Sequence, residues 1–206
     1  ISAILKKVQI DLKLNDHKDE DFLKGQLSDI KEAIRFLENQ RSVITSESST
    51  ALLIQDNAGV FNTAKLLTLQ LYQLTNQEEY LQELLGYHES MIYYRIRSRL
   101  NSRSAQLTAN LPEDVLNKEK ELKDRLNGFL DEQTTMDSFI EDEKLWANFL
   151  EDLKENHPNY YKLRYASISQ SLDDLKQNLP RSTTVVRYVF IGDGLYGFVV
   201  DPDTLT

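Results

Sequence analysis

Apolar side chains recur at every third or fourth position along most of this chain, and that spacing limits its fold more than any other feature. Side chains at this spacing share one face of an α-helix, so the pattern predicts a mainly α protein. Seven glycines and four prolines in 206 residues agree with long helices and few turns. The apolar faces indicate about seven helices, at residues 1–14, 22–37, 60–74, 81–96, 112–132, 136–157 and 159–178.

The predicted helix at 60–74 is the most apolar one. Its main stripe consists of Val60, Ala64, Leu67, Leu71 and Leu74, widened by Leu66 and Leu69. A stripe of this width needs neighbours on two sides, as in a stack of helical repeats. No clean self-similarity at a 34-residue period accompanies it. The Ser/Thr-rich stretch at 45–50 predicts a loop that supplies an N-cap to the next helix.

Residues 111–157 predict a long antiparallel helical hairpin. Pro112 stands at a favoured first-turn position, and an apolar seam with seven-residue spacing follows it. A second stripe follows a bend near 133–135. The first seam is formed by Val115, Leu122, Phe129 and Met136, and the second stripe by Trp146, Phe149, Leu150 and Leu153.

The texture of the sequence changes after Pro180. Residues 183–191 are rich in β-branched and aromatic side chains, 192–194 read Gly-Asp-Gly, and 195–200 form a second apolar run. This order predicts a β-hairpin. Alternate residues point to opposite faces of a strand, and here both faces are largely apolar. We expect a hairpin that needs cover on both faces, although the helices of this chain can cover at most one. In isolation the chain should self-associate through the hairpin or leave it poorly ordered.

Composition excludes several classes of function. The formal net charge of −9 argues against a general nucleic-acid binder. The chain has no cysteine, which excludes disulfides, thiolate metal sites and a cysteine nucleophile, and suits a cytoplasmic setting. No apolar run is long enough to cross a membrane, and Ile1 starts in helical pattern without a signal peptide. No motif predicts a cofactor or a metal ion.

One cluster of side chains is a candidate site for a partner. It lies on the outer side of the predicted helix at 81–96 and just beyond it. Arginines beside tyrosines could bind an acidic peptide or RNA, but in so acidic a chain we favour ion pairs with carboxylates of neighbouring helices. His88, on the apolar face of the same helix, is interpreted as a core histidine. The candidate partner-binding residues are Tyr93, Tyr94, Arg95, Arg97, Arg99 and Arg103.

Several stretches, in their order and spacing, resemble the junction between tetratricopeptide repeats (TPR) and a CHAT domain, a caspase-like domain. The stretch 69–81 resembles the last repeat pair, Leu111-Pro112 with Glu119 and Leu122 the linker helix, and 158–165 the entry into the CHAT domain. Residues 171–180 resemble the first helix of the CHAT domain, and residues 187–200 resemble its first hairpin. The resemblance covers about three quarters of the chain.

The resemblance implies three segments and a function. Residues 1–110 would be TPR-like helical repeats, 111–157 the linker helical hairpin, and 158–206 the start of a truncated CHAT-like domain. The catalytic His and Cys of the family would lie beyond Thr206. The chain would then be a non-catalytic interaction and scaffold segment that contacts a protein or peptide and its own downstream CHAT domain. The alternative is the regulatory arm of an active cysteine peptidase.

Overall fold

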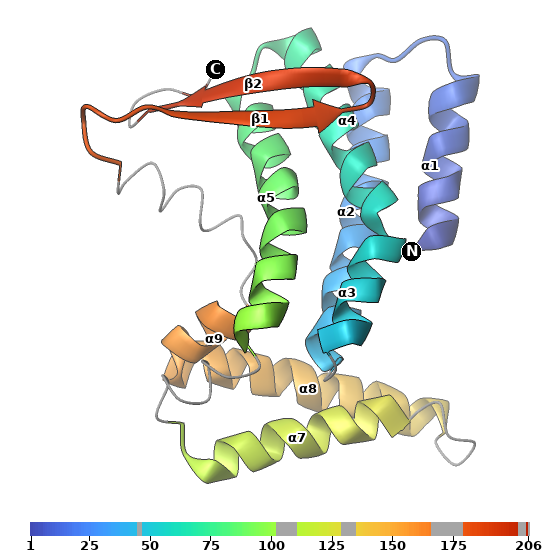
Figure 1. Cartoon of the computed structure of the whole chain (residues 1–206). Helices are drawn as coiled ribbons and strands as arrows, with labels where there is room; N and C mark the ends of the chain where they lie inside the picture. The colour runs from blue at the N-terminus through green and yellow to red at the C-terminus, as the bar shows by residue number, and fades with distance from the viewer. Residues whose placement is uncertain (45–46, 102–110, 129–134, 166–178, 202–204, 206) are drawn as a thin grey trace. The chain divides into compact units, whose positions relative to one another are not determined.

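The structure is a computed structural model that describes residues 1–44, 47–101, 111–128, 135–165, 179–201 and 205, with side chains except at 47–48, 92–101 and 163. In this part of the chain, eight helices precede one two-stranded antiparallel sheet (Figure 1). The elements are α1 Ser2–Leu14, α2 Glu20–Val43, α3 Glu47–Asp56, α4 Ala58–Thr75, α5 Glu78–Asn101, α7 Glu113–Asn127, α8 Met136–Asn156, α9 Pro158–Arg164, β1 Val185–Ile191 and β2 Gly194–Val200.

The mainly helical class and the C-terminal β-hairpin are confirmed. A TPR-like stack is not confirmed and stays a prediction. The loop predicted at 45–50 is wrong from residue 47 onward, because α3 begins at Glu47. Serine and threonine favour helix N-termini as much as loops, since their hydroxyls can bond the free N–H groups of the first turn. The shorter helix predicted at 159–178 is described only as α9, and 166–178 lie outside the described residues.

The chain divides into two compact units, each assembled from separate stretches of sequence. Unit 1 contains residues 1–38, 54–93 and 168–206, and unit 2 contains 39–53 and 94–167. Contacts therefore do not follow the order of the sequence. The predicted boundaries between the TPR-like, linker and CHAT-like segments, after residues 110 and 157, follow from the family resemblance, and they stay predictions.

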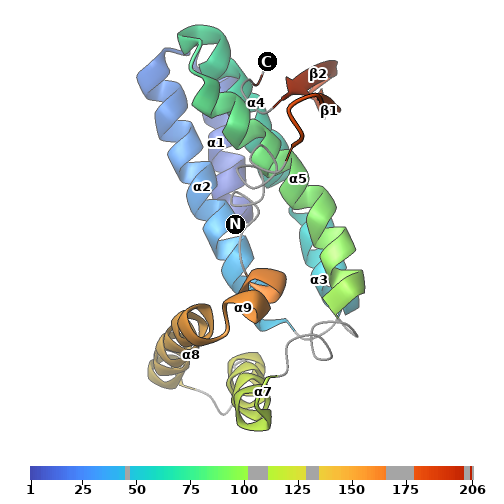
Figure 2. The ribbon, with the colours of Figure 1, turned by 90° about the vertical axis from the view of Figure 1, so that its left-hand side faces the viewer.

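Unit 1 packs α1, α4 and parts of α2 and α5 beside one another (Figure 2). The apolar face predicted for α2 is confirmed, with Ile30 and Leu37 almost fully buried. A Cβ on Gly59 of α4 would lie 3.1 Å from Leu5 Cδ2, so a glycine permits the close approach of α1. Most of the predicted stripe of α4 is buried, but Leu74, at the end of the helix, is 54% exposed and does not belong to it.

Unit 2 is organised around α7, α8 and α9. The first two run side by side in opposite directions (Figure 1). Their shared core contains Leu122, Leu126, Trp146, Phe149, Leu153, Tyr160 and Tyr165. The predicted seam is wrong at its end, because Met136 is 63% exposed. Met136 is the first residue of α8, directly after the N-cap Thr135, and α7 ends at Asn127, before the seven-residue spacing reaches it. Phe129 lies outside the described residues.

Replacing Phe149 by alanine should destabilise unit 2 by about 3 to 5 kcal/mol, because it leaves a cavity in a closed core. Met136→Ala is the matched control at an exposed position and should cost less than about 0.5 kcal/mol. Urea unfolding followed by the fluorescence of Trp146, the single tryptophan, measures both. Equal midpoints for the two variants would contradict this packing.

Candidate interaction surface

The β-hairpin is the first feature of interest, and its turn fixes its register. Gly192 has φ +57°, whereas Asp193 has no positive φ. A positive φ at only the first of two central residues is typical of a type II′ turn, where glycine is favoured. The turn pairs Ile191 with Gly194, and the register continues to Val185 opposite Val200.

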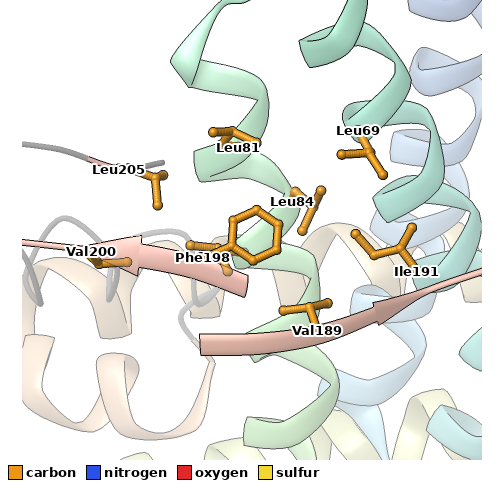
Figure 3. Packing of buried hydrophobic residues seen from close by; sticks show 9 residues of the cluster. Leu69, Leu81, Leu84, Val189, Ile191, Phe198, Val200 and Leu205 are labelled. Carbon is orange, nitrogen blue, oxygen red and sulfur yellow. The ribbon is translucent and has the colours of Figure 1, made fainter. Parts of the chain in front are cut away.

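One face of the hairpin is buried against leucines of α4 and α5 (Figure 3). Val189 and Ile191 of β1 and Phe198 and Val200 of β2 point to this face, and each is at most 4% exposed. Leu205, which pairs with Val200 as an isolated bridge, joins the same cluster. The helical side is formed by Leu69 of α4 and by Leu81, Leu84 and Leu85 of α5.

Two polar contacts add direction to this packing. Arg187 of β1 forms a two-pronged ion pair with Glu89 of α5, from Nε to Oε1 at 2.6 Å and from Nη2 to Oε2 at 2.9 Å. Such forked pairs fix geometry as well as adding attraction. Lys65 of α4 donates a hydrogen bond from Nζ to the carbonyl of Phe190, at 3.2 Å. Both contacts lie along β1 rather than β2.

The opposite face of the hairpin carries a row of exposed apolar side chains. Val186, Tyr188 and Phe190 of β1 are 50%, 67% and 70% exposed, and Leu195 and Val199 of β2 are 58% and 37% exposed. We call these five residues the apolar face. The prediction that the helices cover only one side of the hairpin is confirmed for the described residues. A contiguous apolar surface of this kind is typical of a protein contact site.

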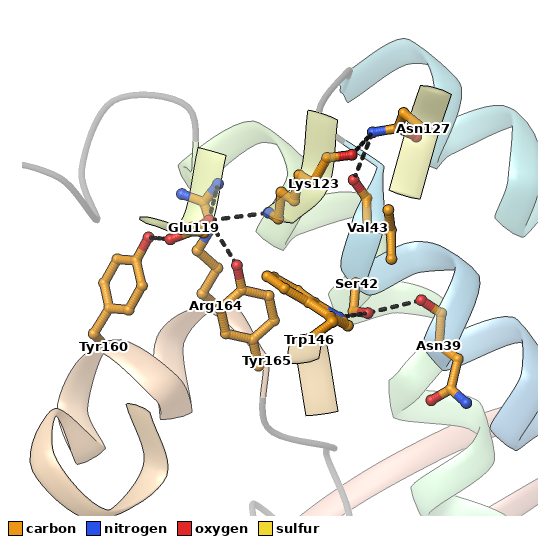
Figure 4. A network of polar contacts seen from close by, with 10 residues as sticks. All are labelled: Asn39, Ser42, Val43, Glu119, Lys123, Asn127, Trp146, Tyr160, Arg164 and Tyr165. Atoms are coloured by element: carbon orange, nitrogen blue, oxygen red, sulfur yellow. Dashed lines mark hydrogen bonds and ion pairs between the residues drawn. The ribbon is translucent and has the colours of Figure 1, made fainter. Parts of the chain in front are cut away.

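Unit 2 contains the second feature, a buried polar network centred on Glu119 (Figure 4). Tyr160 and Tyr165 donate their hydroxyls to the Glu119 carboxylate, at 2.5 and 2.6 Å. Lys123 Nζ and Arg164 Nη2 each lie 3.0 Å from Glu119 Oε1. Burial alone would raise the pKa of Glu119, but the two cations and the two hydroxyls outweigh it and hold that pKa below its usual value.

Lys123 shares one carboxylate with a second cation. Burial lowers the pKa of Lys123 from its usual 10.5 to about 8, against the upward pull of Glu119. Its ammonium group also lies over the rings of Trp146 and Tyr165. The side chains of Glu119 and Lys123 are only 5% and 4% exposed, and their opposite charges are paired with each other. The network therefore specifies the packing of α7 against α9, and we assign it no binding role.

The structure does not test the residues that were predicted to bind a partner. The side chains of Tyr93, Tyr94, Arg95, Arg97 and Arg99, and all of Arg103, lie outside the described residues. His88 is described and is only half-buried, beside Lys65, Glu89 and Arg187. Burial and the charge of Lys65 lower its pKa. Alternation in the sequence showed that both faces of the hairpin are apolar. It did not show which face the helices bury, or that Lys65 lies beside β1.

In the described part of the chain, no group of three or more metal-ligating side chains lies close together. Among these same residues, none of the helices has the length and apolar character that crossing a membrane requires. Comparison with protein-family models, curated proteins and solved structures found no match to this chain. The TPR–CHAT resemblance therefore depends on the sequence stretches alone.

The stability of unit 2 should rise between pH 7 and pH 9.5 by about 1 to 2 kcal/mol. The folded chain releases the Lys123 proton near pH 8, while the unfolded chain holds it to about 10.5, so the unfolded state binds more protons in this range. Above this range the raised pKa values of Tyr160 and Tyr165 act in the opposite direction.

Urea unfolding followed by Trp146 fluorescence across this pH range measures the effect. Lys123→Met keeps the length of the side chain without the charge, and it should flatten the profile. If the profiles of the two proteins run parallel, Lys123 is not the titrating group.

Proposed function

We propose that this chain is a non-catalytic protein-interaction and scaffold segment of a cytoplasmic TPR–CHAT protein, which positions or regulates a downstream caspase-like domain. The observation that carries the interaction part is the apolar face. Five large side chains are held in a fixed register by a hairpin whose other face packs against α4 and α5. A two-stranded hairpin is marginal alone, so the helices provide a rigid base for this surface.

The connection to a caspase-like domain depends on the sequence resemblance. Under this proposal the downstream domain rests on the apolar face, and a partner that binds the helices biases its state through differential contacts. The alternative is the regulatory arm of an active cysteine peptidase. The 206 residues contain no cysteine, so the nucleophile of such a peptidase would belong to another part of the parent protein. A Cys and a His in the parent sequence beyond Thr206 would favour the alternative.

The apolar face should cause the isolated chain to self-associate. Replacing Tyr188 and Phe190 together by serine removes its two most exposed aromatic rings and should give a monodisperse monomer with unchanged helical content. The matched control replaces Ile10 and Leu14 of α1, which are 54% and 78% exposed, by serine and should leave the association unchanged. Sedimentation velocity over a range of concentrations measures both.

A strictly monomeric wild-type chain would remove the basis of this proposal. An equal loss of association in the control would have the same consequence, because self-association would then be a general property of exposed apolar residues.

A further inference from the structure

The two edges of the hairpin differ in what they offer to another strand. Residues of an antiparallel pair alternate between positions bonded to the partner strand and positions whose N–H and C=O point outward. The two-residue turn makes Ile191 and Gly194 a bonded pair, so Val186, Tyr188 and Phe190 direct their backbone groups away from β2. The hydrogen bond from Lys65 to the Phe190 carbonyl agrees with this direction.

The edge of β2 is already partly occupied. Leu205 forms an antiparallel bridge with Val200, and its side chain is buried in the cluster beneath the hairpin. Along β1, the described residues provide one contact to an outward backbone group, the bond from Lys65 to Phe190. The edge of β1 is therefore the more open of the two.

A third strand beside β1 would lie over identifiable positions of the helices. Neighbouring strands are about 4.8 Å apart, which is close to the 5.4 Å pitch of one helical turn. The hairpin lies across α5, with β1 farther along α5 than β2 (Figures 1 and 3). One turn beyond the buried Leu84 and Leu85 is His88. Helix α4 runs in the opposite direction to α5, so the same displacement leads toward its N-terminus. One turn before Lys65 is the exposed Asn62.

The charge at this position is positive, in a chain whose net charge is −9. Arg187 and Glu89 neutralise each other. Within the described residues, the Nζ of Lys65 has a carbonyl as its partner and lies within ion-pair distance of no carboxylate. Lys65 is only 5% exposed, so its charge acts in surroundings that water screens weakly. Burial accordingly lowers the pKa of Lys65.

We propose that the outer edge of β1 binds an extended segment of a separate partner protein in which acidic side chains alternate with apolar ones. Its main chain would pair with Val186, Tyr188 and Phe190. Residues on either side of the one opposite Phe190 would point toward Lys65 and His88, which favours Asp or Glu there. The intervening residues would extend the apolar face, which favours Val, Ile or Thr. The proposal deepens the proposed interaction function and rests on it.

A second copy of this chain does not fit the same edge. Pairing two β1 strands about a two-fold axis perpendicular to the sheet would place the helices of both copies in the same layer. The copy's α4 and α5, which lie beneath its own hairpin, would then take the space beside α4 and α5 of this chain, at the level of Asn62 and His88. A single strand without attached helices on that side meets no such obstacle.

The test uses a fluorescently labelled synthetic peptide of seven residues in which glutamates alternate with valines, and measures its binding to the intact chain by anisotropy. The same peptide with lysines in place of the glutamates should not bind. Lys65→Met removes the positive charge and should weaken binding of the glutamate peptide about tenfold, the effect of one charge-assisted hydrogen bond.

Two proline variants distinguish the edges. Val186→Pro removes an outward N–H of β1, and Leu195→Pro removes the corresponding N–H of β2, at positions that are similarly exposed. Only Val186→Pro should weaken binding, by at least about tenfold. Amide spectra of β2 check that the hairpin remains folded. If Val186→Pro unfolds it, the Lys65→Met result and the reversed-charge peptide decide the question.

Equal binding of the two peptides, an unchanged affinity in Lys65→Met, or binding lost in Leu195→Pro alone would overturn the proposal. So would a fall in self-association caused by a folded Val186→Pro, because the edge would then serve a second copy. The double serine variant of Tyr188 and Phe190 should keep peptide binding within a few-fold, since it retains the backbone groups and Lys65. If the glutamate peptide does not bind while self-association still depends on the apolar face, the proposal for the edge of β1 is wrong and the proposed function is unaffected.

Discussion

The burial of four hairpin side chains on the leucines of α4 and α5 is the interaction on which the candidate site depends. Val189, Ile191, Phe198 and Val200 are almost completely removed from water. At about 1.5 to 3 kcal/mol for each side chain, this burial contributes on the order of 6 to 12 kcal/mol, as an upper limit. A hairpin of two short strands has little stability of its own. Its attachment therefore turns a marginal element into a fixed platform, and the same alternation that buries one face exposes the other.

The packing of unit 2 is specified by a buried polar network rather than by apolar side chains alone. One buried carboxylate, that of Glu119, accepts hydrogen bonds from two tyrosines and faces two cations. Burying these charges is costly, so the network is poor as a source of stability. It instead penalises other arrangements of α7 and α9, because any shift would leave Glu119 or Lys123 without its partner. We infer that the network selects one packing of this unit, and that the interaction surface lies in unit 1.

The sequence predicted those features whose interacting residues are close together along the chain. The hairpin and its turn follow from the pattern of 16 residues, Val185 to Val200, and both were predicted. The sequence made both faces apolar and did not show which one the helices bury. The start of α3 was missed because serine and threonine suit both loops and helix N-termini. Lys123 stands four residues after Glu119, a spacing normally typical of a solvated helix face, and only tertiary packing against Tyr160 and Tyr165 buries it. The position of Lys65 at the edge of β1 spans 125 residues and has no local signature.

Hydrogen exchange of the backbone amides of β1 tests the central claim, that the helices hold one hairpin whose outer edge is open. In the free chain, Arg187, Val189 and Ile191 should be protected, because their N–H groups bond β2, whereas Val186, Tyr188 and Phe190 should exchange rapidly. This alternation along a single strand is the predicted result. Uniform protection would mean that the edge is already covered, and uniform rapid exchange would mean that the helices do not hold the hairpin; either result would contradict the account.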